Sequence, residues 1–103
     1  MKYEIIKDMY DALSQDEVKR VPAVKRLFKL TKKYFALSKD MSKKNKKKYE
    51  KWEKSIKETI YELDLNVSPS AFENLDGYWI LFHVLKELES KRNEILDKHN
   101  ENQ

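Results

Sequence analysis

Glycine and proline are almost absent from this chain. Its 103 residues include one glycine, Gly77, and two prolines, Pro22 and Pro69. Sheets and tight hairpins use such residues, together with asparagine and aspartate, to build their turns. With so few of them, the chain is expected to form long helices joined by short connections. The sequence therefore predicts an all-α protein.

Apolar residues recur three or four positions apart in four stretches, as they do on the buried side of a helix. These stretches are approximately residues 2–14, 22–38, 43–64 and 77–98. A chain of this length forms one domain. We therefore expect an antiparallel four-helix bundle over residues 1–99, with residues 100–103 as a frayed tail.

Short polar side chains mark the expected helix starts. Ser14-Gln-Asp-Glu17 matches a capping box, which predicts a new helical start in the connector before Pro22. Serine and aspartate are preferred N-caps, and proline is favoured in the first turn. The predicted caps of the third helix, of a short helical turn at 69–75 and of the last helix are Ser42, Ser68 and Asp76.

The first half of the last helix, residues 78–85, is apolar on almost every side apart from His83. A helix of this kind is expected to be buried by several neighbours, so Trp79 and Leu85 are both predicted to be core residues. His83 is expected at the core or its boundary, with one hydrogen bond. If the other helices leave part of this helix uncovered, that patch would mark a protein interface.

Five lysines are concentrated immediately before the third apolar stripe: Lys43, Lys44, Lys46, Lys47 and Lys48. Lysines at a helix N-terminus oppose the helix dipole, which favours a binding role for them. A purely solvated lysine-rich surface is the equally open alternative. The predicted partner-binding face combines this run with four residues of the second helix: Arg26, Lys29, Lys32 and Lys33.

Positive charge is unevenly distributed along the chain. Residues 1–69 hold 18 basic and 11 acidic residues, whereas residues 70–103 hold 4 basic and 7 acidic ones. This asymmetry can steer an anionic partner toward one face. Tyr49 and Trp52, although they lie among lysines, fall on the apolar stripe and are expected in the core rather than stacked on bases.

The residues needed for common kinds of catalysis are missing. Without cysteine there is no thiolate nucleophile or zinc-thiolate site. A lone glycine cannot form a phosphate-binding glycine-rich loop. His83 and His99 have no helix-face partner of the kind that metal sites use. We therefore expect a non-enzymatic protein with no cofactor, no metal and no small-molecule substrate.

The cytoplasm is the expected location. The N-terminus carries charged residues early and has no apolar core of a signal peptide. The longest apolar run, residues 78–85, is far shorter than the roughly 20 residues that span a bilayer.

The whole-chain layout resembles the enterocin A type of immunity protein, which protects lactic acid bacteria and their relatives from class IIa bacteriocins. The resemblance lies in the chain length, the absence of cysteine, the basic balance and the four stripes Tyr3–Leu13, Val24–Leu37, Tyr49–Leu63 and Tyr78–Leu96. It implies a cytosolic antiparallel four-helix bundle that acts without catalysis, by blocking the bacteriocin's effect at a sugar-uptake membrane transporter. No signature motif is matched, so no functional residue is carried over.

Three functions are therefore considered. The first is a binding module of the immunity kind, whose basic face meets a membrane-associated protein or the anionic lipid around it. The second is a nucleic-acid-binding or regulatory protein that uses the same lysines to neutralise phosphates. The third is a structural role as a homodimer or a subunit of a larger assembly.

Overall fold

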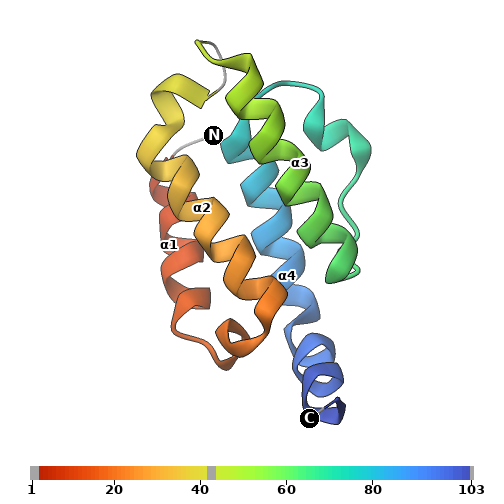
Figure 1. Ribbon diagram of the computed structural model, residues 1–103. Coiled ribbons are helices and arrows are strands. Elements are labelled where there is room, and N and C mark those ends of the chain that lie inside the picture. The colour runs from red at the N-terminus through yellow and green to blue at the C-terminus, as the bar shows by residue number, and fades with distance from the viewer. Residues whose placement is uncertain (1–2, 42–43, 103) are drawn as a thin grey trace.

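The computed structural model describes residues 3–41 and 44–102 and contains four α-helices and two 3₁₀ turns. In chain order the elements are α1 (Tyr3–Ser14), η1 (Glu17–Arg20), α2 (Pro22–Met41), α3 (Lys46–Glu62), η2 (Pro69–Phe72) and α4 (Gly77–Glu101). No strand occurs in either described range. The expected all-α four-helix bundle is confirmed (Figure 1).

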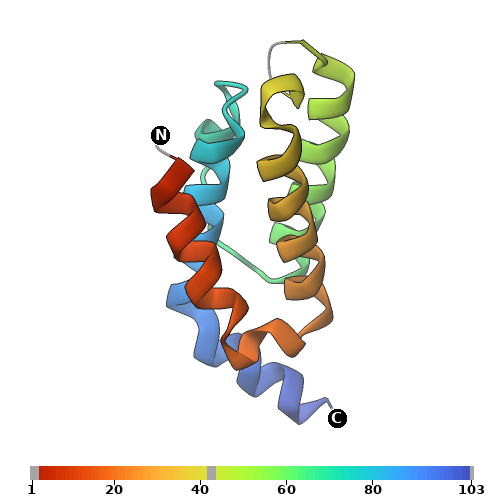
Figure 2. The same cartoon turned by 90° about the vertical axis from the view of Figure 1, so that its left-hand side faces the viewer.

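The helices form two layers, α1 with α4 and α2 with α3 (Figure 2). The first three helices alternate in direction, as expected. The connection from α3 to α4 instead runs back along the bundle, so that α4 is parallel to α1 (Figure 1). Accordingly, the Tyr3 and Tyr78 rings, near the two helix starts, lie 6.0 Å apart. The predicted antiparallel order thus holds for the connections α1–α2 and α2–α3. It does not hold for the connection from α3 to α4, because residues 63–76 are long enough to run back along the bundle before α4 begins.

Both ends of α3 lie inside the predicted range of 43–64. Asn45 is the N-cap, and its side-chain oxygen accepts a hydrogen bond from the Lys48 N–H at 3.1 Å. The predicted cap, Ser42, lies outside the described residues. After α3, Asp64 adopts a left-handed conformation with φ 53°. The Leu65 N–H then donates to the Ile60 carbonyl at 3.0 Å, which closes the helix end.

The predicted caps of the later elements are confirmed. Ser68 and Asp76 accept hydrogen bonds from backbone N–H groups at the starts of η2 and α4. The predicted helical start in the connector before Pro22 is confirmed as η1, but Ser14 is not its cap: Ser14 ends α1, and its Oγ donates to the Asp11 carbonyl at 2.9 Å. Asp16 caps η1 in its place. Both α2 and α4 extend three residues beyond their predicted ends, so Asn100 and Glu101 of the expected frayed tail are helical.

Leu85 is fully buried, as predicted, but Trp79 is 37% exposed, and its predicted place in the core is wrong. The buried residues of α4 lie on one side of the helix: Gly77, Ile80, Leu81, Val84, Leu85, Leu88 and Ile95. At 100° per residue, Trp79 lies on the opposite side of α4. Its ring instead contacts Phe82 and His83, with centroid separations of 6.3 and 4.6 Å. His83 is half-buried, at the boundary of the core as expected.

Gly77 lets α4 begin directly against α2. Tyr34 of α2 is 2% exposed, and its ring lies 4.7 Å from that of Trp52 and 4.8 Å from that of Tyr78. The Gly77 N–H donates to the Tyr34 hydroxyl oxygen at 3.1 Å. A Cβ atom at position 77 would lie 2.2 Å from Cε2 of Tyr34. The requirement for glycine here is therefore steric, since only a residue without a side chain fits.

Candidate functional site

The start of α3, with Lys44 just before it, carries a group of exposed lysines that lie outside the buried stripe of the helix. We define the α3 lysine patch as Lys44, Lys46, Lys47, Lys48, Lys51 and Lys54. Four of these lysines line a shallow hollow together with Glu50. The buried residues of α3 are Tyr49, Trp52, Ile56 and Thr59, which fix the orientation of the helix. The core thus turns the lysines toward solvent.

The α3 lysine patch is poorly neutralised within the molecule. The first turn of α3 contains no acidic residue. One weak ion pair forms, with Lys46 Nζ at 4.0 Å from a Glu50 oxygen. Glu53, the next acid along the helix, is instead paired with Lys57 at 3.0 Å. Positive charge at a helix N-terminus opposes the dipole, so this arrangement does not favour stability.

The four predicted cations of α2 do not join the α3 lysine patch as a single face. Arg26 forms an ion pair with Glu62, the last residue of α3, which lies at the opposite end of that helix from the patch. At 100° per residue, Arg26 and Lys33 lie on the side of α2 toward α3. Lys32 lies on the side toward α1, and Lys29 lies between. The predicted face is therefore divided among separate surfaces. Lys43 lies outside the described residues.

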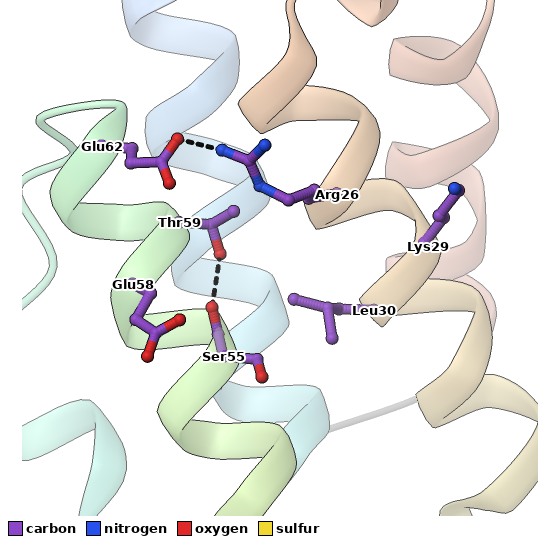
Figure 3. Close-up of a pocket in the computed structure, with 7 residues that line it drawn as sticks. All are labelled: Arg26, Lys29, Leu30, Ser55, Glu58, Thr59 and Glu62. Atoms are coloured by element: carbon purple, nitrogen blue, oxygen red, sulfur yellow. Dashed lines mark hydrogen bonds and ion pairs between the residues drawn. The ribbon is translucent and has the colours of Figure 1, made fainter.

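Between α2 and α3 there is a pocket of about 270 Å³ (Figure 3). It is lined by Arg26, Lys29, Leu30, Ser55, Glu58, Thr59 and Glu62. Its two cations are balanced by two carboxylates, and the Thr59 hydroxyl donates to the Ser55 carbonyl at 2.9 Å. Because the charges cancel, this pocket offers no preference for an anionic ligand.

A second hollow, the α1–α2 groove, has a very different lining. It encloses about 450 Å³ and is lined by Tyr10, Ser14, Lys19, Arg20, Lys25, Phe28, Lys29 and Lys32. Five of these eight residues are cations and none is an acid. Tyr10 and Phe28 meet edge to face, with centroids 5.4 Å apart. The groove therefore combines a concentrated positive charge with an apolar, aromatic part.

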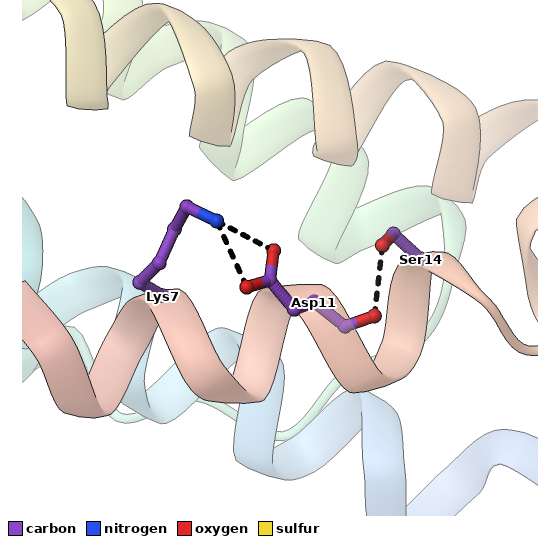
Figure 4. Close-up of polar contacts among 3 residues, drawn as sticks. All are labelled: Lys7, Asp11 and Ser14. Carbon is purple, nitrogen blue, oxygen red and sulfur yellow. Dashed lines mark hydrogen bonds and ion pairs between the residues drawn. The ribbon is translucent and has the colours of Figure 1, made fainter.

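The carboxylate nearest this groove in the sequence is already neutralised. Lys7 Nζ binds both oxygens of Asp11, at 2.7 and 2.8 Å, on the side of α1 that faces α2 (Figure 4). Beyond α1, Asp16 is bound by Arg92 Nε at 2.6 Å. Burial raises the pKa of Tyr10, which keeps its hydroxyl neutral. No ion pair with a described carboxylate offsets the five cations of the groove.

Sequence reasoning found two of the five groove cations, Lys29 and Lys32, and missed Lys19, Arg20 and Lys25. A signal for Lys25 was present, because positions 25, 29 and 32 follow helical spacing on one side of α2. No comparable signal exists for the other two, since their position depends on how η1 folds against α2.

The described residues contain neither a metal-binding cluster nor a membrane-spanning helix. Within 3–41 and 44–102, no cluster of histidine, aspartate and glutamate could hold a metal ion. No helix of those ranges is long and apolar enough to cross a bilayer. No protein-family model, curated protein or solved structure matches the chain.

Proposed function

We propose that this chain is a non-enzymatic binding protein that meets an anionic partner at the membrane through its α3 lysine patch. The observation that carries the proposal is the exposed, poorly neutralised lysine group at the start of α3. A helix selected only for stability would carry acids in its first turn. Lysines at that position are better explained by a partner that supplies the missing negative charge.

The specific form that we propose is bacteriocin immunity, exerted in the cytoplasm at a membrane transporter. Support comes from the small helical bundle, the basic balance and the whole-chain resemblance described above. Anionic lipids around a transporter attract basic protein segments by about 1 kcal/mol per lysine or arginine. The patch would thereby hold the protein close to a membrane-associated target.

Expression in a bacteriocin-sensitive strain tests this form directly. Survival is measured against a panel of class IIa peptides, with the empty vector as control. If the chain is an immunity protein, protection against at least one peptide of the panel is expected. Unchanged killing by every peptide would rule out the immunity proposal.

Nucleic-acid binding is the second candidate, and the α1–α2 groove favours it because five cations line it without an acid. If the protein neutralises phosphates, log K should fall linearly with log salt, with a slope of roughly −0.9 per duplex phosphate contacted. Fluorescence anisotropy with labelled duplex and single-stranded DNA measures that slope. A flat salt dependence, or no binding at low salt, would eliminate this candidate.

A further inference from the structure

The α1–α2 groove contains more positive charge than the bundle can use for its own stability. Its cations are Lys19 and Arg20 of η1 and Lys25, Lys29 and Lys32 of α2. All five are exposed. Like charges brought to one hollow repel one another, and this repulsion opposes folding. A ligand of opposite charge would remove that cost.

The arrangement of the cations indicates a compact ligand. Lys25, Lys29 and Lys32 follow one side of α2 over about 10 Å, at 1.5 Å per residue. On the same side, the next cation after Lys32 is Lys39, two turns further along and outside the groove. At the other end, Lys19 and Arg20 close the groove from η1. The charge that lines the groove is thus confined to about 10 Å of α2 and the adjoining η1.

From this confinement we propose that the α1–α2 groove is a binding site for a polyphosphate group. A single phosphate carries about two negative charges at neutral pH, so five cations exceed what it needs. Two or three linked phosphates match both the charge and the length of the lysine row. The Tyr10 and Phe28 rings provide an apolar surface for the group that carries the phosphates.

The proposed site is separate from the α3 lysine patch, so it goes beyond the proposed membrane function, and it is an alternative to nucleic-acid binding in the same groove. The two surfaces share no lysine. The polyphosphate could be free in solution or part of a lipid headgroup. Both sources present the same chemistry to the groove, and experiment distinguishes them.

Titration of the full chain with sodium triphosphate, by calorimetry at low salt, tests the inference. The groove variant is Lys25→Gln with Lys29→Gln, and the matched control is Lys86→Gln with Lys98→Gln, which removes the same charge from two exposed lysines of α4 outside both basic surfaces. We expect the groove variant to bind at least about tenfold more weakly than wild type, while the control stays within about threefold. Thermal unfolding of all three proteins verifies that they fold.

Absence of triphosphate binding, or equal weakening by both variants, would overturn the inference. The inference would also be overturned if an oligonucleotide without terminal phosphates bound to the α1–α2 groove more tightly than triphosphate does. A nucleic-acid strand would then be the better ligand. Flotation with phosphatidylcholine vesicles, with and without cardiolipin, identifies the source. Cardiolipin-dependent flotation that triphosphate displaces and that the groove variant loses assigns a lipid headgroup, whereas binding of triphosphate alone assigns a free ligand. The protection assay reports on the proposed function independently of either result.

Discussion

Replacement of Gly77 by alanine is the sharpest test of the packing between α2 and α4. Intrinsic helix propensity favours alanine over glycine by about 1 kcal/mol, which would make the variant more stable. The structure predicts the opposite, since the new Cβ would lie 2.2 Å from Cε2 of Tyr34. Tyr34 cannot move aside easily, because it is 2% exposed and packed between the rings of Trp52 and Tyr78.

The magnitude follows from two terms. Overpacking a buried site costs about 1–3 kcal/mol. Displacing the Tyr34 ring also breaks the hydrogen bond from the Gly77 N–H, which adds about 1 kcal/mol. After subtraction of the propensity gain, we expect Gly77→Ala to lower the free energy of unfolding by about 2 kcal/mol. For a domain of this size, that corresponds to a fall in Tm of about 10 °C.

Urea unfolding followed by far-UV circular dichroism measures this difference. The same substitution in a Tyr34→Leu background is the control, because the contacted ring atoms are then missing. There the penalty should largely disappear. A Gly77→Ala protein as stable as wild type, or more stable, would show that the close approach of Gly77 and Tyr34 is wrong.

Three further predictions concern stability. Leu85→Ala should lower the free energy of unfolding by about 2–5 kcal/mol, whereas Trp79→Ala should lower it by less than about 2 kcal/mol, both measured by urea unfolding; equal losses would contradict their different exposure. Tyr49→Phe should leave stability unchanged or raise it by up to about 1 kcal/mol, because the buried Tyr49 hydroxyl has no hydrogen-bond partner among the described residues; a clear loss would reveal a partner. Burial raises the pKa of Asp16, but hydrogen bonds from Arg92 and a backbone N–H outweigh it, so the pKa lies below its ordinary value. The pair therefore stabilises the protein above the unfolded-state pKa, and this stability is lost as pH falls through the folded-state pKa. Arg92→Met should cost about 1 kcal/mol or less at neutral pH, and its thermal unfolding curve should converge with that of wild type in acid; a constant difference would exclude this pair as the cause.

Helix periodicity was sufficient to predict the class of the fold. Apolar spacing placed four helices, and the caps Ser68 and Asp76 were found because their hydrogen bonds are local. The direction of α4 was not predictable in the same way. The residues between α3 and α4 contain no local signal that distinguishes a tight turn from a connection that runs back along the bundle. That choice is made by long-range packing, such as that of Tyr34 against Gly77.

Trp79 shows a second limit of the sequence. The run from Tyr78 to Leu85 is apolar all round, but only three helices are available to cover α4. Its outer side therefore stays exposed, and the aromatic rings there pack on one another. Composition can show that a helix is more apolar than average, but which side remains uncovered depends on the arrangement of the layers.

The basic surfaces were predicted only in part, because some of their residues are brought together by the fold and not by their spacing in the sequence. Of the α3 lysine patch, the adjacent lysines Lys44, Lys46, Lys47 and Lys48 were predicted from the sequence, whereas Lys51 and Lys54 were not. The α1–α2 groove gathers cations from η1 and α2, and only the fold places Lys19 and Arg20 beside Lys29. Conversely, Arg26 was grouped with the lysines although the fold pairs it with Glu62.

The central claim is that the α3 lysine patch is present for binding rather than for stability. The most direct test is to measure the free energy of unfolding and protection from class IIa bacteriocins side by side, for Lys44→Gln, Lys47→Gln and Lys48→Gln combined. A matched control carries Lys33→Gln, Lys39→Gln and Lys98→Gln, three exposed lysines of other surfaces. We predict that the patch variant is as stable as wild type or slightly more stable, because a conflict with the helix dipole is removed, and that it alone loses protection. An unfolded patch variant, or full protection by a folded one, would contradict the claim.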